Sequence, residues 1–310
     1  MDQYIKDLST LIREGEMENT YKMVWIRSIV ESCVLDPKKS LIHFDQLSEK
    51  IFGYYWNQTI YFGLKQCPNP NKLPKIYQIV LEEIERYRVK FGNKPEWFSR
   101  VRNRVKVPLS DISDVLKTDV CWRFPKLNGK HFDIYELDKN KKTINVRSPE
   151  LIKDYSDILF ELINYRWTQK LEEFNHSPRI SRKVLGTDRE RVRRGSLSKF
   201  REYLDLENPN RICFFTNKSL SDKNLSIDHI LPWSYMYSDD LWNLVYVDRG
   251  HNSSKSNQIP NEGVIEKLEL RNKRLLNLFN RNGISTKHKD ELELSIKNNS
   301  VRKFWVGCKG

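Results

Sequence analysis

The stretch SIDHILPWSYMYSDDLWNLVYVDRGHNSSKSN runs from Ser226 to Asn257 and sets two adjacent ionisable residues, Asp228 and His229, in an apolar run that Pro232 closes. Successive side chains of a regular strand point to opposite faces, so both groups serve one site only if the strand ends or bends there. A proline cannot donate a hydrogen bond to a sheet, which fits such an ending. The stretch therefore predicts a strand that delivers two chemical groups at its end.

These residue types predict metal-assisted hydrolysis. Asp228 offers a hard oxygen ligand for Mg²⁺ or Mn²⁺, and Asn252 offers a second, neutral one at the start of a short predicted helix, where an anion such as phosphate also binds well. A histidine such as His229 can take a proton from water near neutral pH. A bound ion would polarise the scissile phosphate and stabilise the leaving oxygen. Clustered carboxylates are too few here for a two-metal site, so we expect one ion per site.

Two further residues of this stretch carry alternative interpretations. Asn243 interrupts an apolar strand, where an amide without partners costs about 1–3 kcal/mol. It is either a purely structural asparagine or one that fixes the loop between two strands and so orients the His229 side chain toward the site. Lys255, one turn after Asn252, either contacts the phosphate or is an ordinary exposed lysine.

The composition favours a folded protein with an anionic partner. The 310 residues carry a formal net charge of +13. Such a charge favours nucleic acid first and an anionic membrane second, although plain solubility explains it too. No apolar run approaches the roughly 20 residues of a membrane span, and the N-terminus has no signal-peptide pattern, so we expect a cytoplasmic protein. The five cysteines are scattered and odd in number, which indicates reduced thiols.

The pattern of apolar residues predicts an α+β protein with three parts. Residues 1–175 are expected to form a helical target-recognition domain with a β-hairpin near 132–147. Its aromatic run at 52–66 either packs in the core or stacks on bases. Residues 206–310 are expected to form a second domain of short strands, a short helix at 252–260 and trailing helices.

Residues 176–205 are predicted to be a basic linker between these domains. They form either a solvated hinge or a bridge that grips phosphates, because arginine and lysine give sequence-independent affinity for a nucleic-acid backbone. The phosphate contacts predicted in this segment are Arg179, Arg182, Lys183, Arg189, Arg191, Arg193 and Arg194.

The stretch quoted above resembles the HNH nucleases, which have the ββα-metal fold. The segments DHILPWS from Asp228, NLV from Asn243 and NSSKS from Asn252 match the family pattern, with a spacing similar to that of the HNH domain in RNA-guided CRISPR effector nucleases. The resemblance implies His229 as general base, Asp228 and Asn252 as metal ligands, and Asn243 as the residue that orients the loop. His251 is implied as an auxiliary ligand or a phosphate contact.

One feature departs from many HNH proteins, which hold a structural zinc between two Cys-x-x-Cys pairs. The corresponding places here read Cys213 to Thr216 and Asp248 to His251, so two or more ligands are missing. We expect no structural zinc and expect aromatic packing in its place.

The resemblance implies a divalent-metal-dependent endonuclease that hydrolyses double-stranded DNA. The size and layout suit a bacterial restriction or phage-defence enzyme, with no membrane partner. Each site would cut one strand, so double-strand cleavage requires a homodimer or successive nicks. Two alternatives stay open at the level of sequence: a nicking or homing-type nuclease of mobile DNA, and a non-catalytic nucleic-acid-binding protein.

Overall fold

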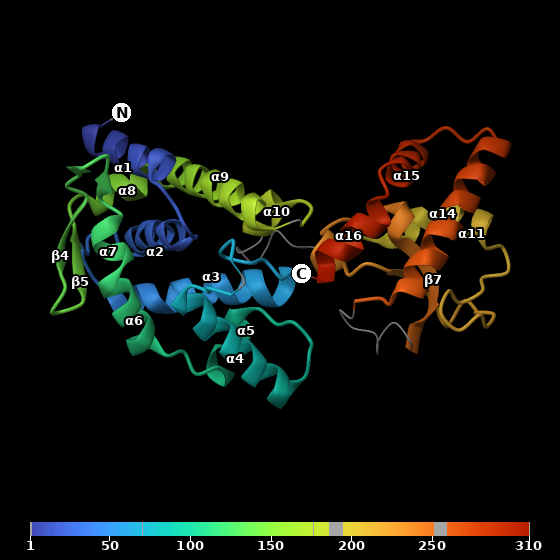
Figure 1. Ribbon diagram of the computed structural model, residues 1–310, viewed down its shortest axis with the longest axis horizontal. Helices are drawn as coiled ribbons and strands as arrows, with labels where there is room; N and C mark the ends of the chain where they lie inside the picture. Colours follow the sequence, from blue (N-terminus) through green and yellow to red (C-terminus); the bar gives the residue numbers. More distant parts are fainter. Residues whose placement is uncertain (1, 70, 176, 186–194, 251–258, 310) are drawn as a thin grey trace. The chain divides into compact units, whose positions relative to one another are not determined.

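The structure, a computed structural model, describes residues 2–69, 71–175, 177–185, 195–250 and 259–309. These residues divide into two compact units. The first holds the residues to 175 together with 180–185, and the second holds 177–179 together with everything described from 195 onward. Figure 1 shows helices dominating both units, so the α+β, mostly helical class predicted from sequence is confirmed.

The first unit is built mainly from helices, and its described strands form two small sheets. Its elements in chain order are α1 (Gln3–Glu14), α2 (Tyr21–Leu35), β1 (Leu41–His43), α3 (Phe44–Phe62), α4 (Lys75–Phe91), α5 (Phe98–Val101), η1 (Arg102–Arg104), α6 (Leu109–Thr118), α7 (Val120–Arg123), β2 (Lys126–Leu127), β3 (Lys130–His131), β4 (Tyr135–Asp138), β5 (Thr143–Val146), α8 (Pro149–Asp154), α9 (Ser156–Phe174) and α10 (Ile180–Leu185).

The core of the first unit is aromatic and centres on α2 and α3. Trp25 on α2 is fully buried, and its indole N–H donates to the Tyr135 hydroxyl over 3.1 Å. The rings of Phe52, Tyr55 and Trp56 on α3 are also fully buried. Of the two interpretations of this aromatic run, core packing is therefore the one that applies to these three rings, because buried rings cannot stack on bases.

Two hairpins stand at one end of this unit. Strands β4 and β5 pair antiparallel, and β1 adds to β5 to give a three-stranded sheet. Strands β2 and β3 form a second, two-stranded hairpin. Its turn consists of Asn128 and Gly129, with φ of 50° and 77°. Positive φ at both central residues is the geometry that matches the twist of the flanking strands, and Asn-Gly is its commonest sequence.

The second unit packs helices around a β-hairpin. Its elements in chain order are η2 (Leu197–Phe200), α11 (Arg201–Glu207), β6 (Leu225–His229), α12 (Trp233–Met236), η3 (Leu241–Asn243), β7 (Leu244–Asp248), α14 (Glu262–Arg281), α15 (Lys287–Lys297) and α16 (Ser300–Lys309).

The hairpin of the second unit pairs β6 with β7 in an antiparallel register that sets Asp228 opposite Val245 and His229 opposite Leu244. Three of the five residues of β7 have side chains less than 3% exposed, as a strand covered on both faces requires. The long helix α14 begins at the Asn261 cap, whose side chain accepts from the Val264 N–H. Helix α14 contributes Ile265, Leu268, Leu275 and Phe279 to the same core.

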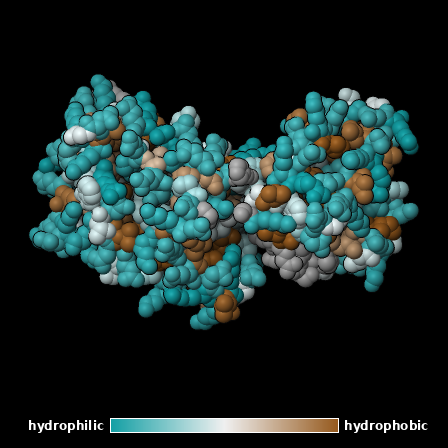
Figure 2. Space-filling view, in the orientation of Figure 1, coloured by the Kyte–Doolittle hydropathy of each residue, from teal (hydrophilic) through white to brown (hydrophobic). Residues whose placement is uncertain are grey.

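The surface is mainly hydrophilic, and most of the cysteines lie buried as free thiols. Hydrophilic side chains cover most of the face seen in Figure 2. All five cysteines lie in the described part of the chain and are free thiols, four of them buried. Within the described ranges, every helix is too short or too polar to cross a membrane.

Candidate active site

The strand β6 ends where the sequence predicts, directly after Asp228 and His229. The last ladder contact is the Ile230 N–H, which donates to the Asn243 carbonyl over 2.9 Å. Pro232 then caps the short helix α12. His229 is 5% exposed, whereas its neighbour Asp228 is only half-buried. The two side chains therefore stand in different surroundings at one strand end, one enclosed and the other half-exposed.

Asn243 joins the two sides of the loop that follows His229. It is fully buried. Its Nδ2 donates to the Leu231 carbonyl over 3.0 Å, and its Oδ1 accepts from the Leu231 N–H over 2.8 Å. One amide thus satisfies both backbone groups of a residue two positions after His229, and this limits how far the strand end can move.

A residue that sequence reasoning missed, Asp239, contacts the histidine directly. The Nε2 atom of His229 lies 3.0 Å from Oδ1 of Asp239, whose side chain is 18% exposed. The loop that carries Asp239 runs from α12 to η3 and begins at Tyr237, which has a left-handed backbone with φ of 53°. The only sequence signal was the adjacent pair of acids at 239 and 240, which nothing local connects to His229.

Asp239 is held in its ionised form. Burial alone raises the pKa of its carboxyl, but the hydrogen bond and charge of His229, with smaller contributions from Trp233 and Lys199, outweigh burial and lower the pKa below its ordinary value. A carboxylate accepts hydrogen bonds and donates none. In the contact between the two residues, Nε2 of His229 is therefore the donor and the Asp239 carboxylate the acceptor.

The next residue, Asp240, anchors the same loop. It is 7% exposed and accepts from the Ser238 hydroxyl and from both terminal nitrogens of Arg179, over 3.3 and 3.4 Å. The Asp240 carbonyl also accepts from the Asn243 N–H over 2.8 Å. Arg179, predicted to be a phosphate contact, is thus engaged within its own unit and braces the loop beside Asp239.

Helix α14 holds this loop from behind. Arg271 is fully enclosed, and its guanidinium donates to the carbonyls of Leu241 and Leu244 over 3.1 and 2.6 Å. The adjacent Asn272 donates to the Trp242 carbonyl over 2.8 Å. Burial lowers the pKa of Arg271, and the nearby Glu207 offsets part of that effect. Helix α14 therefore holds η3 and the start of β7 through buried polar contacts.

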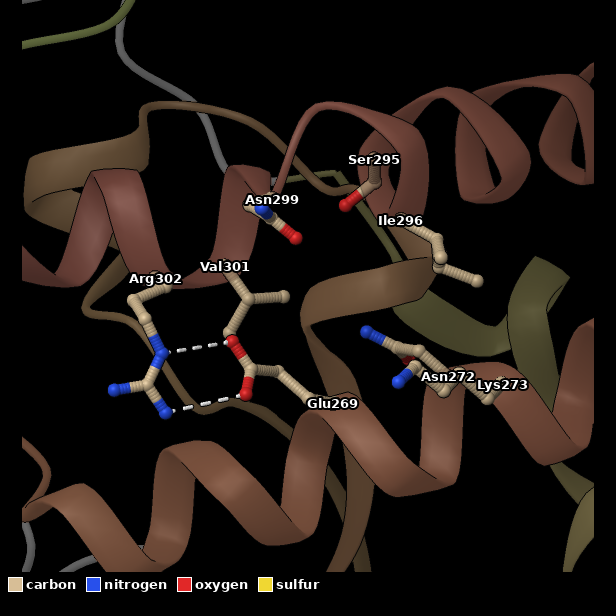
Figure 3. A pocket seen from close by; sticks show the side chains of 8 residues that line it. All are labelled: Glu269, Asn272, Lys273, Ser295, Ile296, Asn299, Val301 and Arg302. Atoms are coloured by element: carbon tan, nitrogen blue, oxygen red, sulfur yellow. Dashed lines mark hydrogen bonds and ion pairs between the residues drawn. The ribbon is translucent and has the colours of Figure 1, made fainter.

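Asn272 also borders a small cavity of about 200 Å³ between α14, α15 and α16. Figure 3 shows Ser295 and Asn299 above this cavity and the Arg302 guanidinium paired with Glu269 at its side. The Ser295 hydroxyl is buried and has no hydrogen-bond partner within the described ranges. The cavity lies next to the residues that hold η3.

The structure places the remaining predicted phosphate contacts in different surroundings. Arg182 is exposed on α10, in the first unit. Lys183 on the same helix is fully buried, which is inconsistent with the predicted backbone contact, because a buried ammonium cannot reach a phosphate. The predictions for Arg189, Arg191, Arg193, Arg194, His251, Asn252 and Lys255 lie outside the described residues.

The donor set at the strand end fits a divalent cation in part. Asp228 provides a half-buried carboxylate oxygen, the donor type that Mg²⁺ and Mn²⁺ prefer. Over the described ranges, no three His, Cys, Asp or Glu side chains gather as a metal centre. A cation on Asp228 therefore needs ligands from elsewhere, and the sequence places the expected ones at 251 and 252.

Cys213 is a buried free thiol at the place where many HNH proteins have the first cysteine of a zinc-binding pair. Burial raises the pKa of its thiol, but the Thr216 hydroxyl and the backbone N–H groups of Phe215, Thr216 and Asp248 more than offset that effect, so the pKa lies below its ordinary value. Thr216 and Asp248 stand where a zinc ribbon has further cysteines, so the expectation that structural zinc is missing remains a prediction.

Comparison with known proteins bears on this unit alone. Residues 213–261 match the family model described as HNH endonuclease. Neither the curated proteins nor the solved structures include a match to the chain. The matched segment contains β6, Asp228, His229, Asn243 and β7, the elements whose contacts define the candidate site. Residues 213–261 therefore form an HNH endonuclease domain within a longer, mostly helical chain.

Proposed function

We propose that this protein is a divalent-metal-dependent DNA endonuclease that hydrolyses phosphodiester bonds at the end of β6. The observation that carries the proposal is the placement of Asp228 and His229 at one strand end, next to a loop tied down by Asn243, inside a segment that matches an endonuclease family. The net charge of +13 supports a polyanionic substrate.

His229 acts as the general base in this proposal. Asp239 accepts the hydrogen bond from Nε2, so Nδ1 takes the proton from the attacking water. We assign Asp239 as a positioning residue, because it acts through the imidazole and not on the substrate. Asn243 fixes the Leu231 backbone and so restricts the direction of the ring.

Asp228 and Asn252, with His251 as an auxiliary group, are the proposed ligands of one Mg²⁺ or Mn²⁺ ion. When bound, that ion supplies positive charge against the negative charge that develops on the phosphate and the leaving oxygen. Lys255, Arg182 and the arginines at 189–194 are proposed to contact the DNA backbone. Arg179 is proposed mainly as a brace for Asp240, since its guanidinium is already engaged.

The biological role that we propose is restriction of foreign DNA or a related phage-defence function. A helical unit of about 180 residues precedes the nuclease domain, which is a layout that lets one part select the target and the other cut. One site cuts one strand, so cleavage of both strands requires two copies of the chain or two successive nicks.

The direct test is incubation of the purified protein with unmodified plasmid DNA and Mg²⁺ or Mn²⁺, followed by sequencing of the ends. Discrete fragments support restriction, whereas a single mapped nick supports a nicking enzyme of mobile DNA. His229→Ala is expected to abolish cleavage and leave DNA binding intact. Cleavage by the purified His229→Ala protein at the wild-type rate would remove His229 from the mechanism. Tight binding without cleavage in any metal would leave only a binding function.

A further inference from the structure

A cluster of cations surrounds one tryptophan on the first unit, far in sequence from the nuclease domain. Trp122 on α7 is half-buried, and its indole N–H is satisfied by the Thr118 carbonyl at 3.0 Å. The ring centre lies 5.2 Å from the Arg123 guanidinium, 5.0 Å from the Lys126 ammonium and 5.4 Å from the Lys139 ammonium. Three cations are thus gathered around a single ring.

The β2–β3 hairpin extends this cluster. Its exposed residues include Lys126, Lys130 and His131, and the Lys130 ammonium lies 4.7 Å from the centre of the Phe132 ring. Lys126 and His131 are directly opposite each other in the hairpin register. An open pocket of about 510 Å³ lies between this hairpin, α7 and β4, and Trp122, Lys126 and His131 are among the residues that line it. In Figure 1, α7 stands beside β4 and β5.

The acids near the cluster are already paired: Asp138, next to Lys139, pairs with Lys141 at 3.6 Å, and three others pair with arginine. Asp119 pairs with Arg123 at 3.1 Å, and Asp133 and Glu136 pair with Arg147 at 3.0 and 2.7 Å. By contrast, Lys126, Lys130 and Lys139 form no ion pair with any carboxylate in the described part of the chain. The cluster therefore carries positive charge that the protein itself does not compensate.

Like charges held close together repel, so such a cluster is favourable only if something offsets the repulsion. The aromatic rings offset part of it, because a cation over a ring face gains about 0.5–1 kcal/mol at an exposed site, and the rings also fix the directions of the long lysine stems. A polyanion would offset the rest. Regularly spaced phosphates suit several ammonium groups on one surface better than isolated carboxylates do.

We propose that Trp122, Lys126, Lys130, His131 and Lys139 form a binding surface for the phosphate backbone of DNA, here called the hairpin patch. The patch takes its ligand, DNA, from the proposed function, but it lies in the unit that the endonuclease family model does not cover. Its lysines contact phosphates, and Trp122 holds them in position. The patch gives the first unit a contact with the substrate that is separate from the cutting site.

The test measures binding without cleavage. The full-length His229→Ala protein is titrated with a 30-base-pair duplex at several salt concentrations, with and without the added double change Lys126→Glu and Lys139→Glu. We expect the added change to weaken binding at least tenfold near 100 mM salt. It should also reduce the slope of log affinity against log salt by about two, the loss expected for two phosphate contacts. Trp122→Ala is expected to weaken binding by a smaller factor, about threefold.

The matched control is Lys38→Glu with Lys39→Glu, two exposed lysines of the same unit, which changes the net charge by the same amount. We expect the control to weaken binding less than threefold. Equal losses in both double variants, or no loss in the patch variant, would overturn the proposal. Binding to phosphatidylserine vesicles that depends on the patch, with DNA binding unaffected, would also overturn it.

Failure of this proposal is separable from failure of the proposed function. Cleavage by the wild-type protein together with an unchanged patch variant refutes the hairpin patch and keeps the nuclease. A patch-dependent loss of DNA binding in a protein that never cuts refutes the nuclease and keeps the patch. Circular dichroism of each variant confirms that the fold is intact, and the charge reversals lie on exposed side chains that the core does not need.

Discussion

The Nε2 atom of His229 and the Oδ1 atom of Asp239 lie 3.0 Å apart, although the two residues belong to different segments of the nuclease domain. His229 ends β6, whereas Asp239 lies in the loop before η3. The loop itself is fixed from two sides, by Arg179 through Asp240 and by Arg271 through the carbonyls of η3 and β7. The direction of the proposed base thus depends on contacts well outside the matched sequence pattern.

Removing the charge of Asp239 is expected to slow cleavage while leaving binding unchanged. In Asp239→Asn the carboxylate that holds the Nε2 proton becomes a neutral amide, so the imidazole loses its preferred tautomer. We expect the single-turnover cleavage rate to fall about 10- to 100-fold, less than or equal to the smallest contribution of about 10²- to 10⁴-fold that proton transfer by a positioned side chain makes, because Asp239 acts only through the imidazole. The dissociation constant for duplex DNA should change less than twofold.

A spectroscopic signature distinguishes positioning from a merely structural role. The side-chain ¹⁵N resonances of His229, assigned by comparison with His229→Ala, report which ring nitrogen carries the proton. They should move in Asp239→Asn even without metal or DNA. Unchanged ¹⁵N resonances alongside a slower rate would show that Asp239 acts in some other way.

The contribution of Asp239 to stability should depend on pH. Its pKa is lowered in the folded protein, so its contribution is present above the ordinary aspartate pKa of about 3.9 and is lost as pH falls toward the lowered folded value. The free energy of unfolding of the wild type and of Asp239→Asn, measured by denaturant titration, should differ at pH 7 and converge toward pH 3. An equal difference at both pH values would contradict the ionised state assigned to Asp239.

Loss of the Asn243 amide should damage both stability and activity. Asn243→Ala leaves the buried N–H and carbonyl of Leu231 without partners, at a cost of about 1–3 kcal/mol in the free energy of unfolding. The cleavage rate should fall as well, because the strand end after His229 is released. The exposed Asn210 provides the control, and Asn210→Ala should change stability by less than about 0.5 kcal/mol. A fully stable Asn243→Ala protein would show that the loop is held without the amide.

Two substitutions on neighbouring helices should differ in their effect on the free energy of unfolding. Arg271→Met removes the buried donor to the Leu241 and Leu244 carbonyls, and each orphaned carbonyl costs about 1–3 kcal/mol. Ser295→Ala removes a buried hydroxyl that has no partner among the described residues, so it should be neutral or slightly stabilising. Denaturant unfolding of both variants checks the pair, and a marked loss in Ser295→Ala would reveal a hydrogen-bonded water or ligand in the adjacent cavity.

Local sequence determined the parts of the site that depend on short spacing. The end of β6 after His229 followed from Pro232 and the apolar run before it. The need of the Asn243 amide for partners followed from its place in an apolar run, although Asn243 ends η3 and does not lie in the strand that the sequence predicted. The helices of the first unit could be predicted in the same way, because the spacing of apolar residues indicates which face of a helix is buried. The Asn128-Gly129 turn carried an equally local signal that the prediction did not use.

Only the tertiary structure decided the contacts that join distant segments. No local pattern connects Asp239 to His229, Arg179 to Asp240, or Arg271 to a loop 30 residues earlier in the chain. The same holds for Lys183, which a basic run places at the surface and packing places in the core. The residue type is read directly from the sequence, but the partner and the burial of its side chain are set by which elements pack together, and that depends on the whole fold.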